Sequence, residues 1–521
     1  MMTALADQAG LAGADTFPRF LRACAASFGV QPAIRLAGES LPDDEISFAE
    51  LESRSAGLAR RLLAEGAGKG ARIGFICGNG PAFAVILAAI ARIGAIAIPV
   101  STLARGAELV RILRQSDMAG LIVQPRLLGR DLIARLGDAL PGLGAGPSAD
   151  LRLAEVPHLR WVASWGQGLP GWVRPLESLG LARAPVDADL LRAVEAEVHA
   201  TDQMVEIYTS GSMAAPKGVA HCHGPVLARV RFMAAMVGRE VGSEARVPLP
   251  MFWVGGLGLG LLVNLASGVT SLCSEGTSTS SGAARGSVFS AEELKARSQA
   301  RPFWSLGMTE TFGPYSWGDD LRAPGQPLAP PIDHLAEGFE LRVVDDAGRP
   351  VGEGETGEIQ VRGHGLAPRL HKFDRAEHFT PDGFYRTGDL GLVEAGRIHF
   401  RGRGGDMIKT AKANVSPAEV EMELARIDGV AAAFVVGLPD AERGQIVAAA
   451  VVARDGAVPD FAAIEAELRD RMAGYKVPRA FVALASDDVP MLPSNKVARR
   501  ELVDLLCRRL GREDLSGAAQ A

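Results

Sequence analysis

Residues 71–100, ARIGFICGNGPAFAVILAAIARIGAIAIPV, decide the fold of this chain. The short apolar run Ala71–Cys77 predicts a buried strand, the apolar run Ala82–Ile93 predicts a buried helix, and Ala95–Val100 predicts a second strand. The same order continues with a helix and a strand near Ala107–Ser116 and Gly120–Gln124. Strands that alternate with helices at this spacing indicate parallel strand–helix–strand units, and therefore an α/β fold with a doubly wound sheet.

The apolar stretches Ala82–Val100 and Phe252–Cys273 are long enough to be tested as membrane spans. Arg92 and Gly94 interrupt the first stretch, and five glycines interrupt the second. Both are therefore interpreted as buried elements of a globular protein.

Five scattered cysteines favour reduced thiols, and the start of the chain lacks the features of a signal peptide, so a cytoplasmic protein is expected.

A length of 521 residues predicts at least two domains, and a net charge of −6 gives no electrostatic reason to expect nucleic acid as a partner. Near the C-terminus, Ser416-Pro417-Ala-Glu419 predicts a helix start that runs to about Ile427. Strands near Ala432–Val436 and Ile446–Val452 and a helix near Phe461–Met472 follow, which indicates a small α+β domain. The polar, glycine-rich run near Gly402–Gly405 predicts the boundary, giving domains 1–402 and 403–521.

The strongest chemical signal is the segment Tyr208-Thr-Ser-Gly-Ser-Met-Ala-Ala-Pro-Lys-Gly-Val219. Backbone N–H groups and hydroxyls in such a loop can surround phosphate oxygens, and Lys217 adds a positive charge. The order Gly-Lys-Ser/Thr of a Walker A loop is missing. Taken alone, the segment is equally consistent with a plain surface turn.

The segment resembles the phosphate loop of the adenylate-forming superfamily, which contains acyl-CoA synthetases and related AMP-dependent ligases. Further motifs that are similar to those of the family occur in the family's order: Pro250-Met-Phe-Trp-Val-Gly-Gly256, Gly307-Met-Thr-Glu310, Tyr385-Arg-Thr-Gly-Asp389, Gly402-Arg403, Asp406-Met-Ile-Lys409, Asn414-Val-Ser-Pro-Ala-Glu-Val-Glu421, Tyr475-Lys-Val-Pro478 and Pro493-Ser-Asn-Lys496. The resemblance implies a large N-terminal domain of doubly wound sheets with a distorted β-subdomain, and a small mobile C-terminal domain.

The resemblance also implies ATP, Mg²⁺ and CoA as ligands and assigns roles to single residues. Lys496 would stabilise charge during adenylation, Glu310 and Thr209 would hold Mg²⁺, and Thr309 would contact the α-phosphate. The predicted nucleotide-binding residues are Thr209, Ser210, Gly211, Ser212, Lys217, Gly307, Met308, Thr309, Asp389, Arg403 and Lys496. The predicted acyl-pocket residues are Phe252, Trp253, Gly255 and Gly256. The residues predicted on the CoA side are Lys409, Lys412 and Asn414, and the predicted hinge residues are Gly405 and Asp406.

The chain departs from the family pattern in several places. Met213 and Ala214 stand where Thr and Gly are usual in the phosphate loop, Lys412 replaces a Gly, and Asn495 replaces the Gly before Lys496. The segment between Lys217 and Thr309 is shortened, and its region 274–300 begins with low-complexity sequence followed by one short predicted helix.

The main interpretation is an acid–thiol ligase that forms acyl-AMP and then an acyl-CoA thioester. One alternative is a catalytically impaired member that binds nucleotide or a partner without turnover, and another is an enzyme that loads a carrier protein. Luciferase-like oxygenation shares the same motifs. Glu206 stands where an amino-group-binding Asp was sought, which favours an apolar acyl or aryl acid. A homodimer is also compatible with the sequence.

Overall fold

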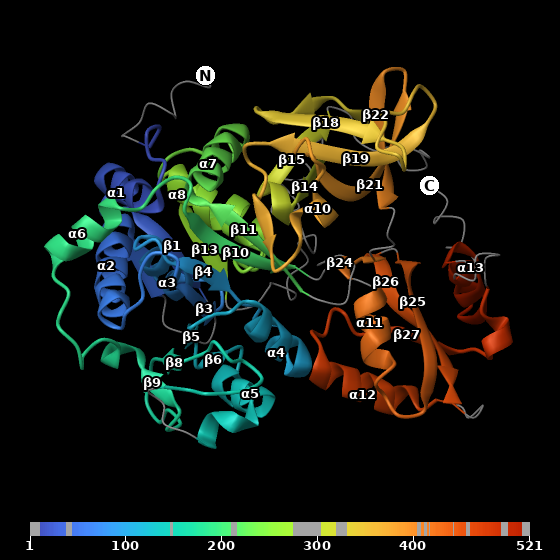
Figure 1. The fold of residues 1–521 in the computed structure, drawn as a ribbon, viewed down its shortest axis with the longest axis horizontal. Coiled ribbons are helices and arrows are strands. Elements are labelled where there is room, and N and C mark those ends of the chain that lie inside the picture. Colours follow the sequence, from blue (N-terminus) through green and yellow to red (C-terminus); the bar gives the residue numbers. More distant parts are fainter. Residues whose placement is uncertain are drawn as a thin grey trace.

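The computed structural model describes residues 11–37, 44–145, 150–209, 216–274, 304–318, 331–403, 408–410, 414–415, 417–440, 442–454, 459–490, 497 and 499–512. Figure 1 shows a large N-terminal part, which ends with β22, and a smaller C-terminal part that runs from β23 to α13.

An eight-stranded sheet lies at the centre of the large part, with the strand order β20-β11-β10-β4-β3-β5-β8-β9. These strands are β3 Arg72–Ile76, β4 Ile96–Pro99, β5 Gly120–Val123, β8 Trp161–Ser164, β9 Val173–Pro175, β10 Gln203–Thr209, β11 Lys217–Cys222 and β20 Arg369–His371. All pairs from β10 to β9 are parallel, whereas β11 is antiparallel to both its neighbours. The predicted doubly wound α/β sheet is confirmed.

Helices cover both faces of this sheet because successive side chains of a strand point to opposite faces. Ile73 and Phe75 enter one core, and Ile76 enters another. The first core contains α2 and α3, and the second contains α4 and α5. These helices are α2 Phe48–Ala64, α3 Pro81–Ala91, α4 Gly106–Gln115 and α5 Leu132–Ala139, with the short hairpin β6 Arg126–Leu127 and β7 Arg130–Asp131 before α5. Ser47 and Glu50 form the capping box of α2.

A second sheet, with the order β12-β13-β1-β2, also packs in the first core. Its strands are β1 Pro32–Ala37, β2 Asp44–Ser47, β12 Glu244–Arg246 and β13 Thr270–Ser274, and the remaining helices of this region are α1 Phe17–Phe28, α6 Ala188–Ala196, α7 His223–Val237 and α8 Val263–Ala266.

A β-rich subdomain lies beside these layers, at the top of Figure 1. It contains a three-stranded sheet of β14 Trp304–Met308, β15 Gly313–Gly318 and β17 His334–Leu335. Its five-stranded antiparallel sheet contains β16 Pro331–Ile332, β22 Arg397–Arg403, β21 Tyr385–Glu394, β19 Thr356–Gly363 and β18 Phe339–Val344, and helix α10 Arg375–His378 precedes β21. This is the β-subdomain that the resemblance implied.

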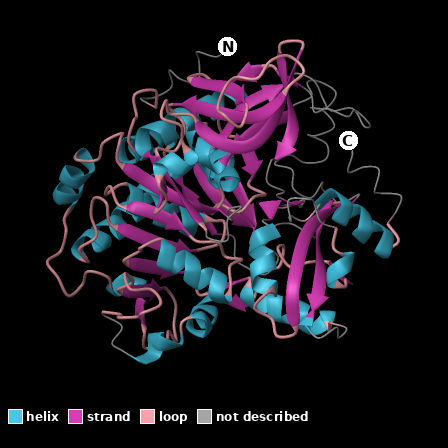
Figure 2. Ribbon diagram, turned by 45° about the vertical axis from the view of Figure 1, so that its right-hand side comes forward, coloured by secondary structure: helices cyan, strands magenta, loops and turns pink. Residues whose placement is uncertain are grey.

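The small part is built on a sheet of β25 Val430–Asp440, β26 Gly444–Ala453 and β27 Ala480–Ala483. The helices α11 Pro417–Leu424 and α12 Phe461–Arg471 cover one face, and α13 Arg499–Arg509 covers the other, as two separate apolar cores demonstrate. In Figure 2 the two long strands run between helices on either side. The short hairpin of β23 Ile408–Lys409 and β24 Asn414–Val415 precedes α11.

Several local predictions differ from the structure in their limits. Helix α11 ends at Leu424 rather than near Ile427, and β25 and β26 are longer than predicted because their pairing continues to Asp440 and Gly444. The second apolar stretch forms a π-helix at Gly255–Leu262, then α8 and β13. Among the described residues, no helix is long and apolar enough to cross a membrane.

The charged residue inside the first apolar stretch, Arg92, can be buried because it is paired with two carboxylates. Arg92 is 2% exposed, and its guanidinium forms ion pairs with Glu52 and Glu195. The low-complexity segment after Ser274, the helix predicted near 291–297 and the cap residue Ser416 lie outside the described residues.

Candidate active site

The predicted phosphate loop connects two paired strands of the central sheet. Thr209 ends β10 and lies directly opposite Lys217, which begins β11. The structure therefore brings the two ends of the loop together, while Ser210, Gly211 and Ser212 lie outside the described residues. The Lys217 ammonium lies 5.9 Å from the centre of the Phe373 ring. Thr209 and Lys217 therefore lie side by side at one end of their two strands.

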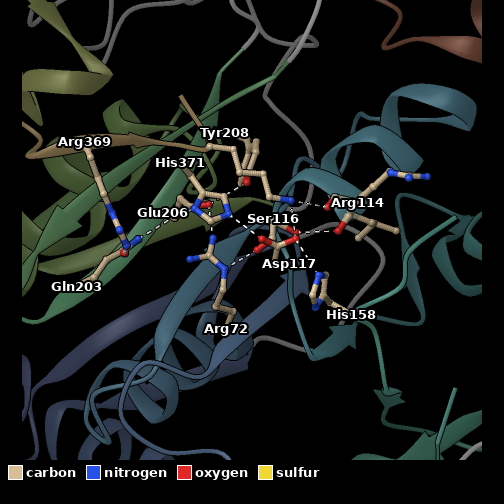
Figure 3. A network of polar contacts seen from close by, with 12 residues as sticks. Arg72, Arg114, Ser116, Asp117, His158, Gln203, Glu206, Tyr208, Arg369 and His371 are labelled. Atoms are coloured by element: carbon tan, nitrogen blue, oxygen red, sulfur yellow. Dashed lines mark hydrogen bonds and ion pairs between the residues drawn. The ribbon is translucent and has the colours of Figure 1, made fainter. Parts of the chain in front are cut away.

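A buried polar network lies at the base of this hairpin (Figure 3). The Glu206 carboxylate is fully buried and accepts hydrogen bonds from Arg72, Gln203 and Tyr208. Burial and the neighbouring Glu206 charge raise the pKa of Tyr208 well above its ordinary value, so the phenol keeps its proton and donates. Because these partners hold the buried Glu206 carboxylate, it is not available to bind an amino group of a substrate.

The same network reaches the end of α4 and strand β20. His371 Nε2 lies 3.2 Å from Asp117 Oδ2, and Lys372 Nζ lies 2.5 Å from Asp117 Oδ1. Gly218 is opposite His371 in the β11–β20 pairing, and a Cβ on Gly218 would lie 2.7 Å from Glu206 Oε1. A glycine is therefore required at the base of the phosphate loop.

We expect the pair of Arg72 and Glu206 to be important for stability. Their side chains are 13% and 0% exposed, so Arg72→Met leaves a buried carboxylate without its guanidinium, which costs about 3–5 kcal/mol. The melting temperature should fall by several degrees in calorimetry. The exposed pair of Arg192 and Asp189 is the matched control, because Arg192→Met should change stability by less than about 1 kcal/mol. Equal effects of both changes would contradict this assignment.

The turn at Thr309 and Glu310 is held by groups from three other segments. His221 Nε2 lies 2.8 Å from the Thr309 carbonyl oxygen, the Tyr385 hydroxyl donates to Glu310 Oε1 at 2.8 Å, and the Ala367 N–H donates to the Glu310 carbonyl at 2.7 Å. Burial lowers the pKa of His221 to about 4, so the ring is neutral at physiological pH and its Nε2–H is the donor. The Glu310 side chain is half-buried, with one carboxylate oxygen positioned by Tyr385.

The two residues before this turn have structural roles. A Cβ on Gly307 would lie 2.8 Å from the backbone of Gly313, so only glycine fits in this strand pairing. The Met308 N–H donates to Thr311 Oγ1 at 3.2 Å. The close strand pairing at Gly307 and the hydrogen bond of Met308 both stabilise the turn that carries Thr309 and Glu310.

Asp389 lies in β21, four residues after Tyr385. Its side chain is largely buried, its N–H donates a hydrogen bond to Thr387 Oγ1, and Gly388 before it adopts a φ of +71°. Arg403 lies opposite Asp389 in the β21–β22 pairing. The predicted ribose-binding carboxylate and Arg403 are therefore neighbours in one sheet.

These contacts connect the predicted nucleotide-binding positions. Strand β11 begins at Lys217 and contains His221, whose ring contacts the Thr309 carbonyl. Strand β21 contains Tyr385, whose hydroxyl contacts Glu310, and it continues to Asp389. His378 lies among them: burial lowers its pKa, Lys217 lowers it further, and Glu310 opposes both effects. One region of the molecule thus holds the predicted phosphate, metal and ribose positions.

A model of the AMP-binding enzyme family matches residues 21–286, about half of the chain, and a model of the AMP-binding enzyme C-terminal domain matches residues 419–496. The chain belongs to the AMP-binding enzyme family. A sulfoacetate–CoA ligase of Cupriavidus necator is 36% identical over 203 residues, which cover 38% of this chain and 39% of the ligase. A feruloyl-CoA synthase of an Amycolatopsis species is 28% identical over 520 residues, covering 90% of this chain and 95% of the synthase.

Solved structures support the same fold. An amide bond synthetase from Marinactinospora thermotolerans superimposes with a TM-score of 0.71 at 22% sequence identity, covering 93% of this chain and 99% of that one. Together the family models and these relatives identify the chain as an AMP-binding enzyme of the AMP-forming acyl-CoA ligase type.

The predicted acyl-pocket residues of this AMP-binding enzyme lie at the start of the π-helix. Phe252 is 4% exposed and Trp253 is partly exposed, with their ring centres 5.4 Å apart. A Cβ on Gly256 would lie 2.1 Å from the Pro250 carbonyl oxygen, and one on Gly255 would lie 2.7 Å from Leu249. The two glycines therefore have a packing role, and the pocket role of the four residues stays a prediction.

The predicted CoA-side residues lie in the small domain. The Lys409 N–H donates to Gln445, and its ammonium lies 4.5 Å from the centre of the Phe400 ring. Asn414 pairs with Lys409 in the β23–β24 hairpin. Lys412, the hinge residues Gly405 and Asp406, and Lys496 lie outside the described residues, so their roles in this AMP-binding enzyme stay predictions.

A cavity of about 260 Å³ opens in the small domain beside Lys409. Three arginines and one tyrosine are among its lining residues, none of which is acidic; the lining is Thr410, Arg443, Gln445, Ile446, Val447, Arg469, Gly474, Tyr475, Val477 and Arg479. Such a cavity suits a phosphorylated, planar ligand, because guanidinium groups bind phosphate and an aromatic ring can stack on a base. The Tyr-Lys-Val-Pro motif located Tyr475, but nothing in the sequence identified the arginines as a group.

Proposed function

We propose that this protein activates an apolar carboxylic acid with ATP and transfers the acyl group to CoA. A carboxylate oxygen attacks the α-phosphorus, the bond from that phosphorus to the bridging oxygen breaks, and pyrophosphate leaves with the electron pair. The sulfur of CoA then attacks the acyl carbonyl carbon, AMP leaves with the electrons of the C–O bond, and the thiol proton is released. The observation that carries this proposal is the chain of contacts from Lys217 through Glu310 to Asp389.

The proposed roles of Thr209, Lys217, Asp389 and Arg403 follow from the positions of these residues in the sheets, and that of Lys496 follows from its motif. Thr209 and Lys217 would bind phosphate oxygens at the end of the hairpin, and Asp389 would accept hydrogen bonds from the two ribose hydroxyls. Arg403, opposite Asp389, would contact the same nucleotide. Lys496 would stabilise the charge that develops on the attacking and bridging oxygens.

The donor set suits Mg²⁺. Glu310 offers a half-buried carboxylate with one oxygen already oriented by Tyr385, and the Thr209 hydroxyl offers a second hard oxygen ligand. Bound there with ATP, Mg²⁺ would supply charge neutralisation of the phosphates. Tyr385 and His221 keep the turn in position before the nucleotide arrives.

The arginine-lined cavity supports CoA rather than a carrier protein as the acceptor. CoA carries a 3′-phosphorylated adenosine diphosphate, whereas the arm of a carrier protein lacks this nucleotide. Arg443 and Arg479 would bind the phosphates of that nucleotide, and Tyr475 would stack on the adenine. Feruloyl-CoA synthase and sulfoacetate–CoA ligase form CoA thioesters by name, which supports the same acceptor.

We expect Arg479→Ala to raise the KM for CoA by about tenfold or more, with a smaller change in kcat, because a charge-assisted phosphate contact contributes about 1.5–3 kcal/mol. The decisive comparison uses dephospho-CoA, which lacks the 3′-phosphate. The native enzyme should prefer CoA, and Arg479→Ala should reduce that preference. Arg508→Ala, on α13 at the opposite face of the sheet, is the matched control and should leave both values unchanged. A preserved preference in Arg479→Ala would contradict this placement of CoA.

The whole reaction is tested with acids labelled with ¹⁸O in the carboxylate, in the presence of MgATP and CoA. The panel should contain aryl, indolyl and straight-chain acids. Mass spectrometry should detect an acyl-CoA and one labelled oxygen in AMP, because the acyl-adenylate carries a carboxylate oxygen to phosphorus. An acyl-CoA whose AMP carries no label would contradict this reaction path. A cytoplasmic location and a homodimer stay predictions.

A further inference from the structure

The outer face of α4 is the surface on which the small domain sits. Glu108 is 5% exposed, and its carboxylate receives the Lys476 ammonium and, at 3.1 Å, the N–H of Ala473. One turn further along, Arg111 Nη1 lies 2.7 Å from Glu423 Oε1, and the Glu423 side chain is fully buried. Residues three apart share one face of a helix, so both pairs belong to one contact. We call Glu108, Arg111, Glu423 and Lys476 the docking contact.

The backbone at the start of α4 is adapted to the same partner. Gly106 has a φ of +44°, and a Cβ there would lie 2.8 Å from the carbonyl oxygen of Asp470 at the end of α12. The N-terminal end of α4 therefore faces the C-terminal end of α12, where the partial charges of the two helices attract. Glycine is required because the two backbones approach closely while φ is positive.

The turn that docks on α4 also forms part of the arginine-lined cavity. Ala473 and Lys476 contact Glu108, whereas Gly474, Tyr475 and Val477 line the cavity. The Tyr475 ring also packs edge-on against Trp253 of the acyl-pocket motif, with centres 6.0 Å apart. Docking therefore fixes the cavity wall and places it beside the large domain.

The docked arrangement presents only one face of the small domain to α4. In the small domain the docking contact comes from α11 and from the turn after α12; these two helices cover one face of the small sheet, whereas α13 covers the opposite face. Helix α13 begins three residues after Lys496. In the docked arrangement α13 therefore lies on the far side of the small sheet from α4, whereas the arginine-lined cavity lies beside the large domain (Figure 1).

From these observations we propose that the docking contact selects the arrangement used for thioester formation, with Glu108 and Arg111 as positioning residues for the second half-reaction. The part of this proposal that concerns the second half-reaction rests on the proposed function, whereas the part that concerns the position of the small domain does not. Removing one partner of a buried ion pair leaves an unpaired buried charge, so Glu108→Gln should shift the small domain away from α4.

The structural test measures the distance between spin labels on two exposed residues, Leu190 in the large domain and Ser486 in the small domain, by pulsed electron resonance. Glu108→Gln should broaden or shift the distance distribution of the native protein, and Asp189→Asn, which breaks an exposed ion pair, should not. The double variant Glu108→Gln/Lys476→Gln removes both charges and should recover part of the native distribution. An unchanged distribution in Glu108→Gln would overturn the proposal.

The functional test separates the two half-reactions. Glu108→Gln should slow transfer from a supplied acyl-adenylate to CoA by about tenfold or more in a single turnover, and it should leave carboxylate-dependent ATP–pyrophosphate exchange within about twofold of the native rate. Equal losses in both half-reactions would overturn the proposal. If the native protein catalyses neither half-reaction, the proposed function fails, and the distance measurement still decides whether the docking contact holds the domain. Arg111→Leu provides a second variant if Glu108→Gln does not fold.

Discussion

Lys496→Ala is expected to lower carboxylate-dependent pyrophosphate release by roughly 100- to 1000-fold, the cost of losing one group that stabilises transition-state charge. During adenylation, negative charge develops on the attacking and bridging oxygens, and an ammonium placed there by the small domain would stabilise it. The loss should appear in kcat, because such an interaction is stronger in the transition state than with bound substrates.

The second half-reaction is the internal control for this variant. A supplied acyl-adenylate should still transfer its acyl group to CoA within a few-fold of the native rate, because the role proposed for Lys496 belongs to adenylation alone. Lys69→Ala is the matched substitution: Lys69 is a half-exposed lysine that pairs at 2.8 Å with Asp202, which precedes β10 at the end of that strand opposite Thr209, and its loss should leave both half-reactions intact. Pyrophosphate release at the native rate in Lys496→Ala would rule out this role.

Glu310→Gln is expected to lower adenylation by roughly 100-fold and to raise the Mg²⁺ concentration needed for half-maximal activity. An amide keeps the size of the side chain and the contact with Tyr385 but removes the negative charge that a hard cation requires. A Mg²⁺ titration of the first half-reaction at saturating ATP measures both effects.

Two further variants make the interpretation specific. Tyr385→Phe removes only the hydroxyl that orients Glu310, so a loss of about tenfold is expected, corresponding to one hydrogen bond to a charged group. Glu377→Gln changes an exposed carboxylate on α10 and should leave the Mg²⁺ dependence unchanged. If Glu310→Gln keeps the native Mg²⁺ dependence, this carboxylate does not hold the metal.

The parts of the fold that depend on local patterns could be predicted from the sequence. The alternation of apolar runs in residues 71–124 predicted β3, α3, β4, α4 and β5, because the hydrophobic periodicity of each element is set by its own residues. The capping box at Ser47 located the start of α2 in the same way. The lengths of β25 and β26 were underestimated, since strand ends depend on pairing with a neighbour rather than on composition.

Contacts between distant segments could not be predicted in this way. The motifs named Thr309 and Glu310, but the groups that contact them, His221 and Tyr385, are separated from them by many residues along the chain. Glu108 and Arg111 have the sequence pattern of ordinary solvent-facing charges on an amphipathic helix. Only the fold reveals that residues more than 300 positions away cover them.

The same limit applies to His221 and His223, whose spacing raises the question of a metal site. In the structure His221 contacts the Thr309 carbonyl, and His223 Nδ1 accepts from the Phe17 N–H at 3.1 Å. Burial lowers the pKa of both rings to about 4, so both are neutral and hold backbone segments together. Their roles depend on carbonyl and N–H groups that no side-chain pattern encodes.

The most direct measurement is the carboxylate-dependent exchange of labelled pyrophosphate into ATP, run without CoA over acids of varied length and ring structure. Exchange that needs both an acid and Mg²⁺, and that is lost in Lys496→Ala, is the result expected if Lys217, Glu310 and Asp389 surround one nucleotide. A native protein that binds MgATP but catalyses no exchange with any acid of the panel would contradict that account.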